Sequence, residues 1–102
     1  MLVDSAKLLG QLDQAPPFDR EVTAKNLSAV VVSECKKSDG PLGAGHVKVN
    51  FAASGTAATV VIDGGPFAGT PVGDCIVERY LRVRVPAFSG SPVSVGKSFT
   101  IE

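Results

Sequence analysis

The chain has 102 residues, a length that fits one domain built around a single core. Of these residues 44% are hydrophobic and 20% are charged, a composition typical of globular proteins and unlike that of disordered chains. Ten basic residues balance ten acidic ones, so the chain lacks the strong positive field of most nucleic-acid-binding proteins. We therefore expect no nucleic-acid partner.

The sequence offers no membrane span, because its longest apolar stretch, from Ala29 to Val32, is far below the length that a bilayer requires. No signal-peptide pattern is present either, since Met1 is followed at once by mixed sequence that includes Asp4. An excised domain of an exported protein and a cytosolic protein both fit this start. Contact with a membrane is expected only through an anchor in a parent protein that this chain does not contain.

Residues 1–17 are expected to form an N-terminal arm or linker remnant in front of a domain that covers residues 18–102. Scattered leucines in the arm give a loose apolar pattern that Gly10 interrupts. Pro16 and Pro17 then separate the arm from the domain, because consecutive prolines cannot continue a helix.

A first helix is predicted from Asp19, a favourable N-cap, to about Lys37. Four residues recur at helical spacing and predict one buried stripe: Ala24, Leu27, Val31 and Cys35. The β-branched run of residues 30–32 argues against a helix, since such side chains lose rotamer freedom there. The alternation of a half-buried strand is absent around the run, however, so the helix is the preferred interpretation.

Residues 46–51 alternate strictly between polar and apolar side chains, and residues 59–62 form a second β-branched run. Ser54 and Gly55 supply a turn between them, so the pattern predicts a β-hairpin with one face on the core. His46, the only histidine, falls on the polar face. We expect it to be an exposed structural residue, because its neighbours Lys48 and Asn50 provide neither a nucleophile nor an orienting carboxylate.

A second helix is predicted after Thr70, a good N-cap, with Pro71 at the favoured first position. Its apolar stripe contains Val72, Cys75, Ile76 and Tyr80, and Tyr80 is expected to anchor the helix on the sheet near Val49 and Phe51. Arg79, Arg82 and Arg84 gather at its end, where cations favour the helix dipole. Pro86 stops the helix, and residues 93–101 alternate as a last strand with Lys97 as the one charged exception on the apolar face.

The two cysteines, Cys35 and Cys75, lack the spacing of a zinc site. Their even number and their positions on two predicted helices favour a disulfide, and two buried free thiols are the alternative. The glycine-rich segments 40–45 and 63–65 lack the Walker and dinucleotide-binding patterns. We therefore expect no metal, no cofactor and no enzymatic activity.

The series Gly45-x-Val47-x-Val49-x-Phe51-x-x-x-Gly55, followed by Val60-x-Ile62, a helix and the segment Val85–Phe88, resembles the TonB C-terminal domain. It is most similar to a two-cysteine variety at the C-terminus of AgmX/PglI-type gliding-motility and other envelope proteins. Cys35 and Cys75-Ile76 match the cysteine positions of that variety, as does the glycine-rich run 64–73. The resemblance covers residues 18–101, although the Tyr-Pro pair of energy-transducing TonB domains is replaced by Pro16-Pro17-Phe18.

This resemblance implies an α+β fold of order α-β-β-α-β, with two helices packed on one face of a three-stranded antiparallel sheet and one disulfide. It further implies a periplasmic, non-catalytic module of a larger envelope protein that binds an extended peptide segment or an envelope protein. Strand addition at a sheet edge would be the mode of binding. The expected docking strand comprises Val93, Ser94, Val95, Gly96, Lys97, Ser98 and Phe99. The alternative is a structural or regulatory C-terminal cap that self-associates as a homodimer.

Overall fold

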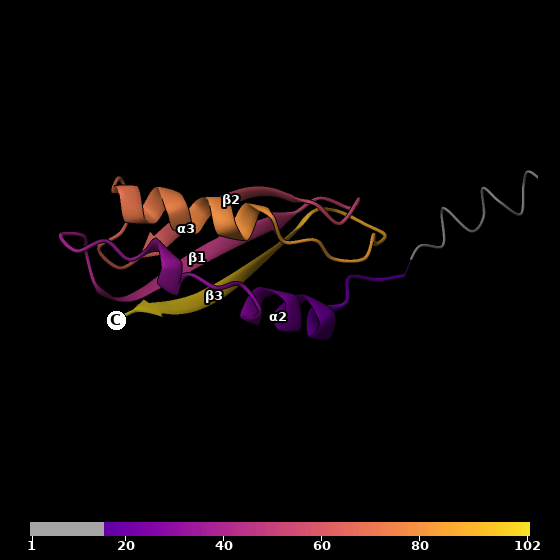
Figure 1. Cartoon of the computed structure of the whole chain (residues 1–102). Coiled ribbons are helices and arrows are strands. Elements are labelled where there is room, and N and C mark those ends of the chain that lie inside the picture. The colour runs from indigo at the N-terminus through magenta and orange to yellow at the C-terminus, as the bar shows by residue number, and fades with distance from the viewer. Residues whose placement is uncertain (1–15) are drawn as a thin grey trace, which may run out of the picture.

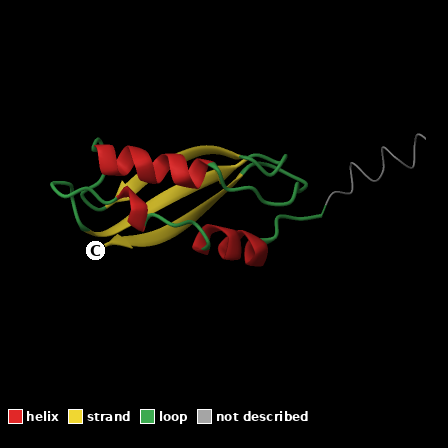
Figure 2. Cartoon of the chain, in the orientation of Figure 1, coloured by secondary structure: helices red, strands yellow, loops and turns green. Residues whose placement is uncertain are grey.

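The structure, a computed structural model, describes residues 16–102. Within that part the elements run α2 (Arg20–Ser28), the 3₁₀ helix η1 (Ser33–Cys35), β1 (Gly43–Phe51), β2 (Ala57–Gly64), α3 (Pro71–Leu81) and β3 (Val93–Ile101). The expected α+β class and element order are thus confirmed, with η1 as an addition (Figures 1 and 2). The expected N-terminal arm falls almost wholly on residues 1–15, which lie outside the described part.

The described strands form one antiparallel sheet in the order β2-β1-β3. The central strand β1 buries Val47, Val49 and Phe51 completely on one face. The helix α3 covers that face over β1 and β2, while α2 lies beside β3 (Figure 1). Because β1 pairs on both sides, β2 and β3 are the two edges of the sheet, which agrees with the edge position that the resemblance implied for the last strand.

The hairpin strands are longer than predicted, since β1 begins at Gly43 and β2 extends from Ala57 to Gly64. Glycine is a poor strand former, so the added glycines gave no strand signal in the sequence. At Gly45 the packing of a neighbouring side chain requires glycine. Gly45 pairs with Phe99 across the sheet, and a Cβ at Gly45 would lie 2.5 Å from Cζ of that ring. The aromatic ring of Phe99 therefore occupies the space that Gly45 leaves.

The prediction that the first helix continues to Lys37 is wrong. The helix α2 does begin after Asp19, whose carboxylate accepts a hydrogen bond from the backbone N–H of Val22 at 3.0 Å. It ends at Ser28, just before the β-branched run 30–32, and only the short η1 follows. The loss of rotamer freedom that such side chains suffer in a helix is the physical reason.

The predicted apolar stripe of that helix is correspondingly broken. Leu27 and Cys35 are buried, but Ala24 is exposed and Val31 has 53% of its surface exposed. Val32 packs into the core from the irregular segment between α2 and η1. The segment thus contributes side chains to the core without helical periodicity.

The second helix agrees closely with the prediction. The Thr70 hydroxyl accepts a hydrogen bond from the N–H of Gly73 at 3.0 Å, and Pro71 is the first helical residue. The buried face of α3 includes Val72, Ile76 and Tyr80. The aromatic partner of Tyr80 is Phe99 of β3, with ring centroids 6.4 Å apart.

The connection after α3 is fastened to the hairpin turn. Val85 N–H donates to the carbonyl of Gly55, and Phe88 N–H donates to that of Ala53, both at 2.9 Å. Phe88 also meets the ring of Phe18 edge to face, with centroids 4.9 Å apart. These contacts bring the start of the domain, the turn and the last connection together at one end of the sheet.

Replacing Tyr80 with alanine is expected to lower the free energy of unfolding by about 3–5 kcal/mol, because a large aromatic side chain only 1% exposed is removed and a cavity remains. Denaturant unfolding measures the change. Val61→Ala, at a side chain with 51% exposure, is the control and should cost about 0.5 kcal/mol or less. A loss below about 1 kcal/mol for Tyr80→Ala would contradict its place in the core.

Candidate functional site

The outer side of β3 is a long unpaired strand edge. The strand pairs with β1 along its whole length, from Phe51 opposite Val93 to Gly43 opposite Ile101, without a shift in register. On its other side, no strand of residues 16–102 pairs with it. All residues of the expected docking strand therefore lie in one edge strand: Val93, Ser94, Val95, Gly96, Lys97, Ser98 and Phe99.

The direction of the backbone groups in β3 follows from the hairpin. Ala52 N–H donates to the carbonyl of Thr56 at 2.9 Å, so the backbone groups of Ala52 point toward the β2 side. Backbone groups alternate in direction along a strand, and the odd-numbered residues of β1 therefore bond to β3. Their partners in β3 are also odd-numbered. The even-numbered residues thus direct their N–H and C=O groups outward: Ser94, Gly96, Ser98 and Thr100.

The two faces of β3 differ in character. The even-numbered side chains are small or hydroxylated and lie exposed on the open face of the sheet. On the core side Val93 and Val95 are half-buried, and Phe99 is 8% exposed. The predicted exception, Lys97, points to the core side at the end of α2, with Nζ 3.3 Å from the hydroxyl oxygen of Ser28. One face of the edge is therefore open and polar, and the other is apolar beside α2.

The opposite edge, β2, is less regular. Its register with β1 shifts twice, between His46 and Val47 and between Asn50 and Phe51. Each shift is an irregularity of the bulge type, which increases local twist and interrupts the regular spacing of backbone groups. A shallow hollow of about 290 Å³ lies beside this edge, against α3. The shifts make β2 a poorer template for an added strand than β3.

His46 lies on the open face and has a partner that sequence reasoning missed. Its Nδ1 is hydrogen-bonded to Oδ1 of Asp63. Asp63 lies close because β1 and β2 remain paired as far as His46 and Gly64, the residue that follows Asp63. This hydrogen bond is the main cause that lowers the pKa of the Asp63 carboxyl below its usual value. Counting residues outward from Gly55 would have placed position 63 or 64 opposite His46, but the predicted second strand ended at Ile62.

Asn50 forms a small polar network on the same face. Its amide donates to the Thr59 hydroxyl at 2.6 Å, and the hydroxyl of Ser94 donates to its side-chain oxygen. These bonds cross all three strands, since Asn50 is central, Thr59 belongs to β2 and Ser94 to β3. The network uses these polar groups to join neighbouring strands.

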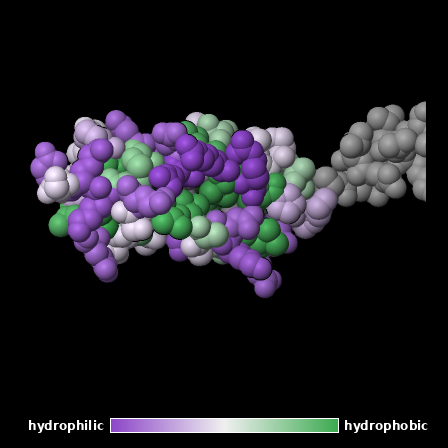
Figure 3. Space-filling view, viewed as in Figure 1, coloured by the Kyte–Doolittle hydropathy of each residue, from purple (hydrophilic) through white to green (hydrophobic). Residues whose placement is uncertain are grey.

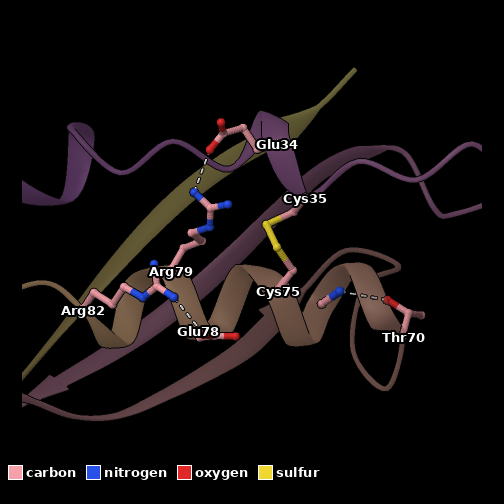
Figure 4. Close-up of a disulfide and its surroundings, with 8 residues drawn as sticks. Glu34, Cys35, Thr70, Cys75, Glu78, Arg79 and Arg82 are labelled. Atoms are coloured by element: carbon pink, nitrogen blue, oxygen red, sulfur yellow. Dashed lines mark hydrogen bonds and ion pairs between the residues drawn. A yellow bond between two sulfur atoms is a disulfide. The ribbon is translucent and has the colours of Figure 1, made fainter.

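The arginines at the end of α3 are each engaged within the domain. Arg79 pairs with Glu34 at 2.7 Å, and Arg82 pairs with Glu78 at 2.8 Å (Figure 4). Arg84 donates to backbone carbonyls at the helix end. An open hollow of about 260 Å³ is lined in part by Arg79 and Arg82. The face of the domain seen in Figure 3 carries hydrophobic residues among hydrophilic ones. These contacts agree with the expectation that the arginines are solvated side chains whose positive charges interact favourably with the C-terminal end of the helix dipole.

A disulfide joins Cys35 to Cys75, with the two Cα atoms 5.6 Å apart. The predicted pairing is confirmed, although Cys35 lies in η1 and not in the first helix. Figure 4 shows the bridge reaching from η1 down to α3, with the Glu34–Arg79 ion pair beside it. The bond therefore ties the irregular segment after α2 to the helix that covers the sheet.

No family model, no curated protein and no solved structure matches the chain. Within residues 16–102, no helix combines the length and apolar character that crossing a membrane requires. The same residues bring together no group of three or more His, Cys, Asp or Glu side chains that could hold a metal ion.

Reduction of the disulfide is expected to lower the free energy of unfolding by about 4 kcal/mol, because the bridge closes a loop over a sequence separation of 40. Unfolding with and without reductant measures this loss. Cys35→Ser, Cys75→Ser and the double variant should each show a similar loss, since all three break the same bond. The double variant should no longer respond to reductant.

Intact-mass measurement on protein from an oxidising compartment provides the decisive check. The expected mass is that of the oxidised chain. Two free thiols would contradict the bridge, and an unchanged unfolding curve in reductant would contradict its role in stability.

Proposed function

We propose that this chain is a non-catalytic protein-interaction module of the bacterial cell envelope, which binds an extended segment of a partner protein by adding a strand to β3. The observation that carries the proposal is the outer side of β3, nine residues long and without a register shift. Unpaired N–H and C=O groups along such an edge can bond an incoming strand through its main chain.

The local geometry supports β3 over β2 as the docking edge. An added strand would bond to the outward groups of four residues: Ser94, Gly96, Ser98 and Thr100. The small side chains of these residues leave the open face beside the new strand uncrowded. On the other face, Val93 and Val95 offer half-buried apolar surface to alternate side chains of the partner. Main-chain bonds would provide affinity, and these two unlike faces would provide selectivity.

The compartment and the family are proposals of the same account. A disulfide that joins two elements of a small domain favours an oxidising compartment such as the periplasm. The element order and the antiparallel three-stranded sheet agree with the resemblance to two-cysteine TonB C-terminal-like domains. We infer a non-catalytic role because the polar groups of the open face are used in cross-strand pairs such as Asn50–Thr59 and His46–Asp63.

Replacing Ser98 with proline is expected to abolish partner binding while the domain stays folded. Proline removes the outward N–H of Ser98 and leaves the bonds to β1 intact. The measurement is capture of the partner from envelope extract with the oxidised domain as bait, accompanied by circular dichroism and unfolding of each variant.

Two control variants accompany it. Ser98→Ala keeps the backbone donor and should bind as the parent chain does. Val60→Pro alters an outward amide of the β2 edge, and the folded fraction of that variant should also bind. Full capture by folded Ser98→Pro would rule out the β3 edge. A mass that rises with protein concentration in size-exclusion chromatography, and a loss of that rise in Ser98→Pro, would instead indicate self-association through the same edge.

A further inference from the structure

Lys97 places a positive charge in the middle of the apolar side of β3. It is the only charged residue of that strand, and its neighbours on the same side, Val95 and Phe99, are apolar. Val47, directly opposite it in β1, is completely buried. Lys97 is itself half-buried. A charge in such surroundings is unfavourable unless a group of opposite charge approaches it.

No acidic side chain of residues 16–102 forms an ion pair with Lys97. Its Nζ contacts the Ser28 hydroxyl at the end of α2. Lys25 adds a second positive charge in the last turn of that helix, whereas Glu21 lies in the first turn, ~10 Å from Ser28 along the helix axis. Glu102 follows the end of β3, ~17 Å from Lys97 along the strand. The charge of Lys97 is therefore not balanced by a neighbouring acid.

Acidic groups such as Asp63 and Glu34 are already matched within the domain. On the open face, the ring of His46 fills the space over Gly96, where a Cβ would lie 2.7 Å from its Nε2. That ring is hydrogen-bonded to Asp63 on the same face. In η1, Glu34 is paired with Arg79 of α3. Lys97 differs from these groups because it lies in the edge strand itself and has no acidic partner among residues 16–102.

An antiparallel strand added to β3 would place one residue directly opposite Lys97. The backbone groups of Lys97 point toward β1, so Lys97 and this residue would form a non-hydrogen-bonded pair on the outer side of β3. Directly opposite residues share a face, and their Cβ atoms lie about 4.5–5.5 Å apart, closer in non-hydrogen-bonded pairs. The side chain opposite Lys97 therefore determines whether its charge is matched.

We propose that β3 selects an extended strand with an aspartate or glutamate directly opposite Lys97 and apolar residues on either side of it on the same face. This inference rests on the proposed strand addition at β3 and specifies the partner's chemistry. The carboxylate pairs with Nζ of Lys97, while the apolar neighbours contact Val95 and Phe99. A strand with an apolar or basic residue at that position leaves the lysine unmatched, and an inward-pointing charge keeps such strands off a sheet edge.

The same lysine opposes pairing of two copies of this chain through β3. When two antiparallel β3 strands, each spanning Val93–Ile101, overlap fully, position 97 lies on the symmetry axis and each Lys97 faces the other. Like charges directly opposite each other are destabilising. The sequence of β3 is therefore a poor ligand for its own edge, and replacing its central lysine with glutamate makes it a better one.

The test uses three peptides with the 9-residue sequence of β3, in which the central residue is lysine, glutamine or glutamate. Each peptide is titrated into the oxidised chain, and the backbone amide signals of Ser94, Gly96 and Ser98 report binding at the outer side of β3. We expect the glutamate peptide to bind about threefold to fivefold more tightly than the glutamine peptide, the range of a cross-strand pair of opposite charges. The lysine peptide should bind least.

Two variants assign the preference to Lys97. Lys97→Gln should bind the three peptides about equally, and Lys97→Glu should reverse the order, so that the lysine peptide binds most tightly. Lys48→Gln is the matched control, because Lys48 lies in β1 on the opposite face of the sheet and the order of affinities should stay as in the parent chain. Circular dichroism establishes that each variant is folded, and Lys97→Gln decides alone where Lys97→Glu does not fold.

The outcomes separate this inference from strand addition itself. Equal affinity of the three peptides for the parent chain, with the outward amides of β3 perturbed, would overturn the inference and leave strand addition standing. A preference that persists in folded Lys97→Gln, or that disappears in Lys48→Gln, would also overturn it. If none of the peptides perturbs the outward amides, strand addition at β3 and the selection by Lys97 both fail.

Discussion

The disulfide between Cys35 and Cys75 holds in place the least regular part of the described domain. Between the end of α2 and the start of β1 the chain contains only the three residues of η1 as a regular element. Such a segment has few backbone bonds of its own, and fixing it in one conformation is opposed by chain entropy. The bridge offsets part of that cost by restricting the unfolded chain, and it positions Val32 and Cys35 in the core. The bridge therefore fixes η1 against α3, while buried side chains such as Ile76 and Tyr80 hold α3 on the sheet.

A second constraint comes from the central position of β1. The strand uses one side for its hairpin partner and the other for β3, so the described sheet has two edges. These edges are not equivalent. The two register shifts make β2 irregular, whereas β3 stays in register over its full length. The packing of Phe99 over Gly45 helps to fix the register of β3. The unshifted register that makes β3 a regular partner for β1 also makes its outer side a regular template for another strand.

Much of the fold follows from local signals in the sequence. The capping residue Thr70 with Pro71 gave the start of α3, and the alternation of residues 93–101 gave β3 with the bounds that the structure has. The predicted end of the first helix was wrong because apolar residues continue at a spacing of three or four through the valines after Ser28, although the β-branching of valine opposes a helix. Periodicity cannot distinguish a helix from an irregular segment that the tertiary structure holds against a core.

The candidate site was predictable only in part. The resemblance to TonB C-terminal-like domains implied that the last strand is an edge, but not the shifts that make the other edge irregular. The Asp63 partner of His46 was hidden because bulges and glycine strand ends give no alternating pattern. The ring of His46 over Gly96 depends on side-chain placement across two strands, which a single sequence does not encode in any local pattern. Contacts that depend on register were therefore found only in the structure.

Amide hydrogen exchange of β3 in the free, oxidised chain is the most direct measurement of the central claim, that β3 is an ordered but unpaired edge. The account predicts alternation along the strand. Slow exchange is expected at residues bonded to β1 (Val95, Lys97, Phe99) and fast exchange at the outward residues (Ser94, Gly96, Ser98), because only the first group has main-chain partners. Slow exchange at both groups would show that the edge is already covered, and fast exchange at both would show that β3 is not a stable strand. Either result would contradict the account.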